Sequence, residues 1–314
     1  MEFQTKIPLK KQSKNQIDYD SNILLLGSCF SENIGSKLDY FKFKNSQNPF
    51  GILFHPKAIE TLVVNAIEEK VYKEDDILFV NEQWHCFDAH SKLSRLTEED
   101  LLQVLNNQIK VTKKGIQDAS HIVITLGTAW MYRFIESKKV VANCHKVPQK
   151  EFTKELMSVK DIIQSLQNIG STIKKVNRKA RIIFTVSPVR HLKDGFIENT
   201  QSKSHLITAI HTIMNNNVTY FPSYEIMMDE LRDYRFYDQD MVHPNKLAIN
   251  YIWNKFVEVW ISEASKKTMD DVAFVQKGIQ HKPFNPDSEA HQSFLKKIEI
   301  KKVWLQSNYA HIEF

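Results

Sequence analysis

The sequence predicts an α/β protein with a parallel β-sheet that is covered by helices on both faces. Short apolar runs rich in β-branched residues recur along the chain, and amphipathic helical patterns separate them. Strand and helix therefore alternate at the spacing of parallel crossovers, in which each helix packs back onto the sheet. The runs are apolar throughout instead of alternating with polar residues, which indicates burial on both faces.

Four of these runs are expected to be the strands because each is bounded by turn or cap residues. A helix is expected at 97–114, where a Thr cap precedes acidic residues and a leucine-rich stripe. The expected strands are NILLLG at 22–27, HIVITLG at 121–127, RIIFTVSP at 181–188 and VTYFP at 218–222, and further helices are expected at about 158–176, 199–216 and 244–262.

Residues 40–95 do not fit a simple crossover and are expected to be an insertion after the first strand and helix. The insertion holds a helix at about 56–70 and a hairpin around ILFVNEQWHCFDAH. A second hairpin is expected in WMYRFIESKKVVANCHKVP, where aromatic and β-branched residues flank a polar turn. The main domain is expected to span 1–261, and the Lys-rich residues 262–314 are expected to form a C-terminal extension with a helical stretch near 288–300.

The composition is that of a folded globular protein. The 314 residues are 42% hydrophobic and 11% aromatic, enough to bury a substantial core in one large domain or two smaller ones. Lys and Arg number 42 against 37 Asp and Glu. The net charge of +5 is scattered and forms no basic stripe, so no nucleic-acid partner is expected.

The sequence also indicates the compartment. No segment approaches the roughly 18 uncharged apolar residues that a membrane helix requires, and the charged N-terminus has no apolar signal region. The three cysteines, Cys29, Cys86 and Cys144, form no C-x-x-C pair, so a reducing compartment fits better than a disulfide framework. These features predict a soluble, cytoplasmic protein without a membrane partner.

Two nucleophilic side chains, Ser28 and Cys29, follow the first strand in ILLLGSCFSENIG. In an open α/β sheet, reactive groups lie beyond the carboxyl ends of the strands, where helix starts leave backbone amides free. A helix beginning near Ser31, with Glu32 in its first turn, would direct its positive end at these residues. Either residue could therefore be a nucleophile, and neither is chosen by this pattern alone.

A base and its orienting carboxylate are expected far downstream, in DQDMVHP. Asp240 and His243 stand three residues apart before the last core helix, with Pro244 at the expected first helical position. A carboxylate that orients an imidazole in one short turn is what a nucleophile-activating base requires. The same D-x-x-H spacing also occurs in ordinary surface turns.

This set of blocks resembles a known family. GSCFS, NPFG, LGTAWMY, NCHK, SPVRHLKDGF and MVHP together are similar to the bacterial GSCFA family, within the SGNH or GDSL hydrolase superfamily, over about residues 20–260. The resemblance implies a three-layer α/β/α fold with a flavodoxin-like parallel sheet. It also implies ester or acyl-transfer chemistry, on carbohydrate substrates.

The resemblance assigns roles to the two nucleophilic side chains. Aligned with the superfamily pattern G-D-S-L-S-D-N, Cys29 falls on the nucleophilic Ser and Ser28 on the Asp that braces the loop. Ser28 could serve instead if the turn were one residue tighter, and Cys29 could be a small buried apolar residue. If Cys29 is the nucleophile, the helix N-terminus and a protonated His243 are expected to lower the pKa of its thiol.

The oxyanion donors are the point of departure from the superfamily. In the superfamily, a G-x-N-D block supplies an Asn side chain that donates to the oxyanion. The corresponding block of this sequence reads Gly127-Thr128-Ala129-Trp130 and contains no Asn. The resemblance leaves Thr128, Asn48 and Asn143 as substitutes for the side-chain donor of that Asn. The superfamily also takes one oxyanion donor from a glycine in a second sequence block, and the resemblance implies that Gly51 is this glycine. Loss of one donor costs on the order of 10² to 10³ in rate.

Several histidines and cysteines could suggest a metal site. His85, Cys86 and His90 in WHCFDAH, with Cys144 and His145 in NCHK, include zinc-ligand types. Their spacing matches no common zinc pattern, and neighbouring residues of a hairpin strand point to opposite faces. No metal and no cofactor are therefore expected.

Other polar residues are candidates for the pocket wall. His145 is one, and Arg190 and His191 in SPVRHLKDG follow the end of a strand, so they would line the pocket or else lie in a solvated loop. KSHL at 203–206 is interpreted as a helix face. Three functions fit these residues: an acyl-ester hydrolase, a sugar O-acyltransferase with the same acyl-enzyme step, and a silent carbohydrate-binding protein. The expected partner is a small-molecule or carbohydrate acyl ester.

Overall fold

The computed structural model describes residues 4–314 and contains a five-stranded parallel sheet in the order β10-β9-β5-β1-β2. All four predicted strands are confirmed, and β2 is an additional edge strand. Its sequence NSQ is short and polar, so no apolar run reveals it. The strands are β1 (Ile23–Gly27), β2 (Asn45–Gln47), β5 (His121–Leu126), β9 (Arg181–Val186) and β10 (Val218–Phe221).

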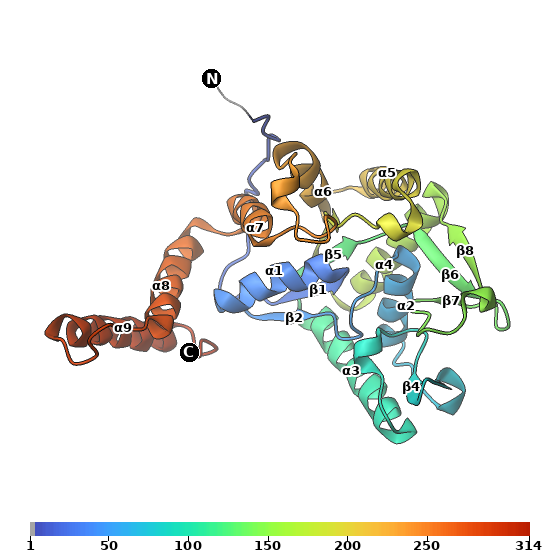
Figure 1. Cartoon of the computed structure of the whole chain (residues 1–314), viewed down its shortest axis with the longest axis horizontal. Helices are drawn as coiled ribbons and strands as arrows, with labels where there is room; N and C mark the ends of the chain where they lie inside the picture. Colours follow the sequence, from blue (N-terminus) through green and yellow to red (C-terminus); the bar gives the residue numbers. More distant parts are fainter. Residues whose placement is uncertain (1–3) are drawn as a thin grey trace.

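Helices cover both faces of the sheet, which gives the three layers that the sequence predicts (Figure 1). Alternate residues of each strand enter opposite cores: Leu24 and Leu26 pack in one, Leu25 in the other. The first core is formed with α2 (Pro56–Ile67), α3 (Glu98–Asp118), α4 (Val159–Val176) and α5 (Phe196–Ile213). The second is formed with α1 (Cys29–Tyr40), α7 (Lys246–Trp260) and the π-helical segment Ile226–Glu230 that follows α6 (Ser223–Glu225).

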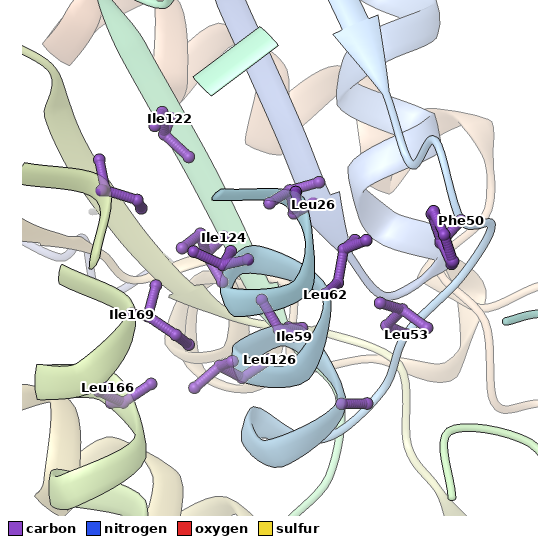
Figure 2. Packing of buried hydrophobic residues seen from close by; sticks show 14 of the residues in the cluster. Leu26, Phe50, Leu53, Ile59, Leu62, Ile122, Ile124, Leu126, Leu166 and Ile169 are labelled. Carbon is purple, nitrogen blue, oxygen red and sulfur yellow. The ribbon is translucent and has the colours of Figure 1, made fainter. Parts of the chain in front are cut away.

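The expected insertion at 40–95 contributes to the main fold. Its segment 45–47 is the edge strand β2, and Ile59 and Leu62 of α2 pack against strand residues such as Leu26 and Ile124 (Figure 2). The first expected hairpin is present as β3 (Leu78–Val80) and β4 (Gln83–His85). The second is present as β6 (Trp130–Phe134) and β7 (Val140–Val141), extended by an unpredicted third strand, β8 (Phe152–Leu156).

The C-terminal residues form two packed helices, α8 (Glu263–Gln280) and α9 (Glu289–Asn308), which reach away from the sheet in Figure 1. The expected helical stretch near 288–300 is part of α9, whereas α8 was not predicted. The two helices approach closely at Gly278, where an added Cβ would lie 2.3 Å from Cδ1 of Ile298. Within residues 4–314, no helix combines the length and the apolar character that a membrane crossing requires.

Candidate functional site

A tight turn at the end of β1 creates the centre of the site. Gly27 has a φ of 122°, and a Cβ at this position would lie 2.1 Å from the carbonyl oxygen of Thr125. The amide of Ser28 donates to the same oxygen at 3.0 Å. Because only glycine tolerates this close approach, the chain can turn directly from the strand into α1. Helix α1 therefore begins at Cys29, two residues before the expected start at Ser31.

Ser28 and Cys29 differ in what they face. Ser28 is the N-cap of α1 and is 0% exposed, with its Oγ accepting from the amide of Phe30 at 3.4 Å. Cys29 is the first residue of the helix and is partly exposed. The serine thus has a structural role at the helix start, whereas the thiol is the more accessible of the two nucleophilic groups.

The pKa of Cys29 is raised, which corrects the expectation that it would be lowered. Burial of the thiol is the largest cause, followed by the negative charge of Glu32. The positive charge of Lys203 and the amides of Cys29 and Phe30 act in the opposite direction. The helix N-terminus does favour the thiolate as expected, but it does not outweigh the loss of hydration at this position.

Asp240 and His243 form a hydrogen-bonded pair in one turn. Nδ1 of His243 lies 2.6 Å from Oδ2 of Asp240, and Oδ1 accepts the amides of Val242 and His243 at 2.9 Å each. The amide of His243 and then its ring are the main causes that lower the pKa of Asp240 to about 2. The carboxylate is therefore ionised near neutral pH and accepts a hydrogen bond from the N–H at Nδ1, which leaves Nε2 as the acceptor nitrogen.

The helix after this turn starts later than expected. Helix α7 begins at Lys246, with Asn245 as its N-cap accepting the amides of Leu247 and Ala248. Pro244 is therefore not the first helical residue. It pairs instead with Tyr237 in an isolated β-bridge. The helix starts after Asn245 because the side chain of this residue accepts two backbone amides and so caps the helix.

The loop after β9 holds this turn at the carboxyl edge of the sheet. The amide of Arg190 donates to the carbonyl of Val242 at 3.3 Å, and the guanidinium of Arg190 donates to the carbonyl of Met241. Burial first, then the charges of Lys203 and His243, lower the pKa of His191 to about 3. His243 thus lies close enough to the loop after β9 for its charge to act there, at the same sheet edge as Cys29.

Asn48 lies beside the turn at Gly27 with one polar atom unused. Its Oδ1 accepts the amide of Gly27 at 2.8 Å, and the side chain is 8% exposed. Its Nδ2 is buried and has no hydrogen-bond partner among residues 4–314. The amide of Gly51 donates to the carbonyl of Asn48 at 2.7 Å, so this glycine amide is already used in the turn.

The other two candidate donors make structural contacts. The hydroxyl of Thr128 bonds Ser202 at 3.0 Å and accepts the amide of Trp130 at 3.0 Å. Oδ1 of Asn143 accepts the amide of His145 at 2.9 Å. The bond of Asn143 uses its oxygen and not its Nδ2, so among these three side chains Asn48 is distinguished by a donor that is buried and without a partner within residues 4–314.

His145 follows β7 in the sequence, and its side chain packs against the end of the first hairpin. Its Nε2 bonds the carbonyl of Cys86 at 2.7 Å, and its ring stacks on His85. Burial is the main cause that lowers the pKa of His145 to about 4. In the part of the chain that the structure describes, no group of three or more His, Cys, Asp or Glu side chains is arranged to hold a metal ion.

Comparison with known families identifies the chain. Residues 22–256 match the model of the GSCFA family, a segment that includes every candidate site residue. The chain belongs to the GSCFA family. Residues 272–314 match the C-terminal domain of GSCFA domain proteins, over the second half of α8 and all of α9. A comparison with curated proteins finds no match.

The GSCFA chain has one site residue that the sequence analysis missed. Lys203 on α5 is 1% exposed, and its Nζ donates to the carbonyls of Gly127 and Ser187 at 2.8 Å each. Burial is the largest cause that lowers its pKa to about 7. The sequence contains a signal for this placement, because Lys203 precedes Leu206 by three residues and Ile210 by seven, on the apolar stripe of the helix.

A cleft of about 420 Å³ lies beside Arg190 in this GSCFA-family protein. The guanidinium of Arg190 lies 4.5 Å from the ring centre of Tyr237 and 5.4 Å from that of Tyr234. Nε of Arg190 and Nε2 of His191 are buried without partners among the described residues. Arg190 therefore connects an aromatic cleft to the turn of Asp240 and His243.

Proposed function

We propose that this GSCFA-family protein is an SGNH-type acyl-ester hydrolase that works through a covalent acyl-enzyme on Cys29. The observation that carries the proposal is the 2.6 Å bond between Nδ1 of His243 and Oδ2 of Asp240, in a turn held at the carboxyl edge of the sheet. This bond gives the imidazole one orientation and leaves Nε2 free to take a proton. Cys29 begins a helix at the same edge.

Cys29 is supported as the nucleophile by its exposure. Ser28 is fully buried and caps α1, so a substrate would have to displace structure to reach its Oγ. The raised pKa of Cys29 means that the thiol keeps its proton near neutral pH. The proposed enzyme therefore needs a general base, and His243 with Asp240 supplies one.

In the proposed reaction, His243 takes up and returns a proton once during acylation and once more during hydrolysis of the thioester. Nε2 takes the proton of the Cys29 thiol as Sγ bonds to the acyl carbon, and the carbonyl electrons move onto oxygen. The tetrahedral intermediate collapses, and the leaving alkoxide receives the proton from Nε2. Water then repeats the sequence on the thioester and releases the acid. Nδ2 of Asn48 is the donor proposed for the oxyanion, since it is buried, has no partner within residues 4–314, and belongs to a side chain whose Oδ1 is held by the amide of Gly27.

The cleft beside Arg190 supports a polar ester as the substrate. Two tyrosine rings and a guanidinium offer flat apolar faces and hydrogen-bond donors together, a combination that suits the alcohol part of a carbohydrate ester. Transfer of the acyl group to a sugar hydroxyl would use the same intermediate. Product analysis with and without added sugar distinguishes transfer from hydrolysis.

The acyl-enzyme itself provides the test. The protein is incubated with p-nitrophenyl acetate or an acetylated sugar, quenched in acid, and the peptide containing residues 27–30 is analysed by mass spectrometry. We expect one acetyl group on Cys29, and none on the peptides of Cys29→Ala and His243→Ala. Ser28→Ala is the matched control: it should lose about 1 kcal/mol of helix capping and still form the adduct. An acetyl group on Ser28 would contradict the assignment.

A further inference from the structure

The cleft beside Arg190 combines aromatic rings with a cation. Tyr234 and Tyr237 both line it, with ring centres 5.9 Å apart and ring planes at 47°. Cζ of Arg190 lies 4.5 Å from the ring centre of Tyr237 and 5.4 Å from that of Tyr234. Because the rings exclude water from part of the guanidinium, its charge is screened less than that of an exposed arginine. The cleft can therefore hold a ligand that has both an apolar face and a charged group.

Arg190 has hydrogen-bond donors that the fold does not use. Its Nη2 donates to the carbonyl of Met241, which engages one of the five N–H donors of a guanidinium. Its Nε is buried and has no partner within residues 4–314. A buried donor without an acceptor costs free energy, and a ligand oxygen would recover it. The positive charge of the group favours a ligand oxygen that is itself charged.

The carboxylates nearest to this cation in the cleft and the adjoining turn are engaged with other residues. Asp233, in the lining, pairs with Arg235 at 3.1 Å. Asp240, in the adjoining turn, bonds Nδ1 of His243 at 2.6 Å. Arg190 itself forms no ion pair with an acidic side chain in the part of the chain that the structure describes. The guanidinium therefore lacks a counter-charge from the protein.

The remaining charges of the lining cancel each other. Asp229 and Arg232 contribute one charge of each sign, and both side chains are exposed to solvent, whereas Arg190 is partly buried. Solvent screens the two exposed charges more strongly than the buried one. Since Arg235 neutralises Asp233, Arg190 supplies the net positive charge of the cleft.

The backbone connects Arg190 to the proposed general base. The amide of Arg190 donates to the carbonyl of Val242 at 3.3 Å, and its guanidinium donates to the carbonyl of Met241. Met241 and Val242 are the residues between Asp240 and His243. A ligand group that Arg190 binds therefore lies beside the turn that carries the imidazole.

We propose that Arg190 is a specificity-determining residue that binds an anionic group, a carboxylate or a phosphate, on the sugar part of the substrate. Tyr234 and Tyr237 then pack against the apolar face of the sugar ring. A neutral sugar would leave the guanidinium without a counter-charge, so a charged sugar binds more tightly. The identification of this sugar as the substrate rests on the proposed function, but the preference of the cleft for an anion does not.

Binding of sugars that contain no ester tests the preference without any turnover. Methyl β-glucoside, methyl β-glucuronide and methyl β-glucoside 6-phosphate differ only at C6, and the Kd of each is measured by isothermal titration calorimetry. We expect one or both anionic sugars to bind at least about tenfold more tightly than the neutral glucoside. Added salt should reduce this preference. The tighter of the two anions distinguishes a carboxylate site from a phosphate site, and the absence of any preference would overturn the proposal.

Two substitutions of Arg190 separate its charge from its contact with Met241. Glutamine keeps a donor for the carbonyl but has no charge, so Arg190→Gln should bind the three sugars alike. Arg190→Lys keeps the charge without the planar fork and should retain part of the preference. This conservative variant keeps the test decisive where Arg190→Gln fails to fold, because a folded lysine variant with the full wild-type preference for a carboxylate would overturn a role for the fork.

Lys193→Gln is the matched control. It removes the same charge from the same loop, at an exposed residue outside the lining of the cleft. Its preference for the anionic sugars should equal that of the wild type. An equal loss of preference in Lys193→Gln and Arg190→Gln would assign the effect to the general charge of the surface and overturn the proposal.

The proposed function and this specificity can fail separately. A preference for anionic sugars that Arg190→Gln abolishes, in a protein that forms no acyl-enzyme, would support the anion site and reject the proposed function. An acyl-enzyme on Cys29 in a protein that binds all three sugars alike would support the proposed function and overturn the role of Arg190.

Discussion

Nδ1 of His243 lies 2.6 Å from Oδ2 of Asp240, while the other oxygen of the same carboxylate accepts the amide of His243 at 2.9 Å. One carboxylate thus fixes both the ring and the backbone of one histidine. The pair is half exposed, at 49% for the histidine side chain and 50% for the aspartate, so it contributes little to stability. Its value lies in the orientation and tautomer of the imidazole.

Asp240→Asn should separate orientation from folding. The amide oxygen can still accept the backbone amides, so the turn and the melting temperature should be retained. The imidazole loses its anionic partner and can adopt the wrong tautomer, and kcat should fall by about 10⁴. Asp238→Asn, in the same turn, is the control and should turn over acyl esters like the wild type. Steady-state kinetics on both variants decide the point, and near-normal turnover by Asp240→Asn would exclude the pair from catalysis.

Asn48→Asp should remove the proposed oxyanion donor and keep the bond to Gly27. Aspartate also tolerates the positive φ of 40° at this position. We expect kcat to fall by about 10² to 10³ with little change in KM. The alkylation profile of Cys29 in the same variant measures any effect of the added charge on the thiol. Thr128→Val, which breaks the contact with Ser202, should lower stability but preserve kcat; the reverse pattern would assign the donor to Thr128.

Acid should destabilise the fold through His55, the N-cap of α2. Its Nδ1 accepts the amide of Ala58 at 3.1 Å and its Nε2 bonds the carbonyl of Val141 at 3.0 Å. Burial lowers its pKa to about 4, despite the opposing bond to Val141. Between about pH 6.5 and 4 the unfolded chain binds a proton at this residue and the folded chain does not, so stability falls as the pH decreases through this range.

His55→Asn should remove this acid sensitivity, because asparagine caps a helix without titrating. From pH 7 to pH 5 the wild type should lose about 2 kcal/mol more free energy of unfolding than the variant. Urea unfolding at the two pH values measures the difference. His281→Asn, at an exposed residue, should behave like the wild type. Equal losses in all three proteins would show that His55 does not carry the effect.

The sequence by itself determined the layers of this protein. Leu24, Leu25 and Leu26 are apolar in succession, and a strand can place such residues only in two cores, so helices had to cover both faces. The pairing of Asp240 with His243 could also be predicted, because both groups lie within one turn. These features depend on residues that are close in sequence, where spacing alone decides which side chains can meet.

Only the tertiary structure decided the edge strand β2, the start of α1 at Cys29 and the place of Lys203. NSQ pairs as a strand because β1 offers it a free edge, and Cys29 begins the helix because Thr125 of the neighbouring strand packs against Gly27. Burial raised the pKa of Cys29 where its helix position alone predicted the opposite. Strand ends and buried charges depend on segments that are distant in sequence, and their hydration is set only when those segments pack together.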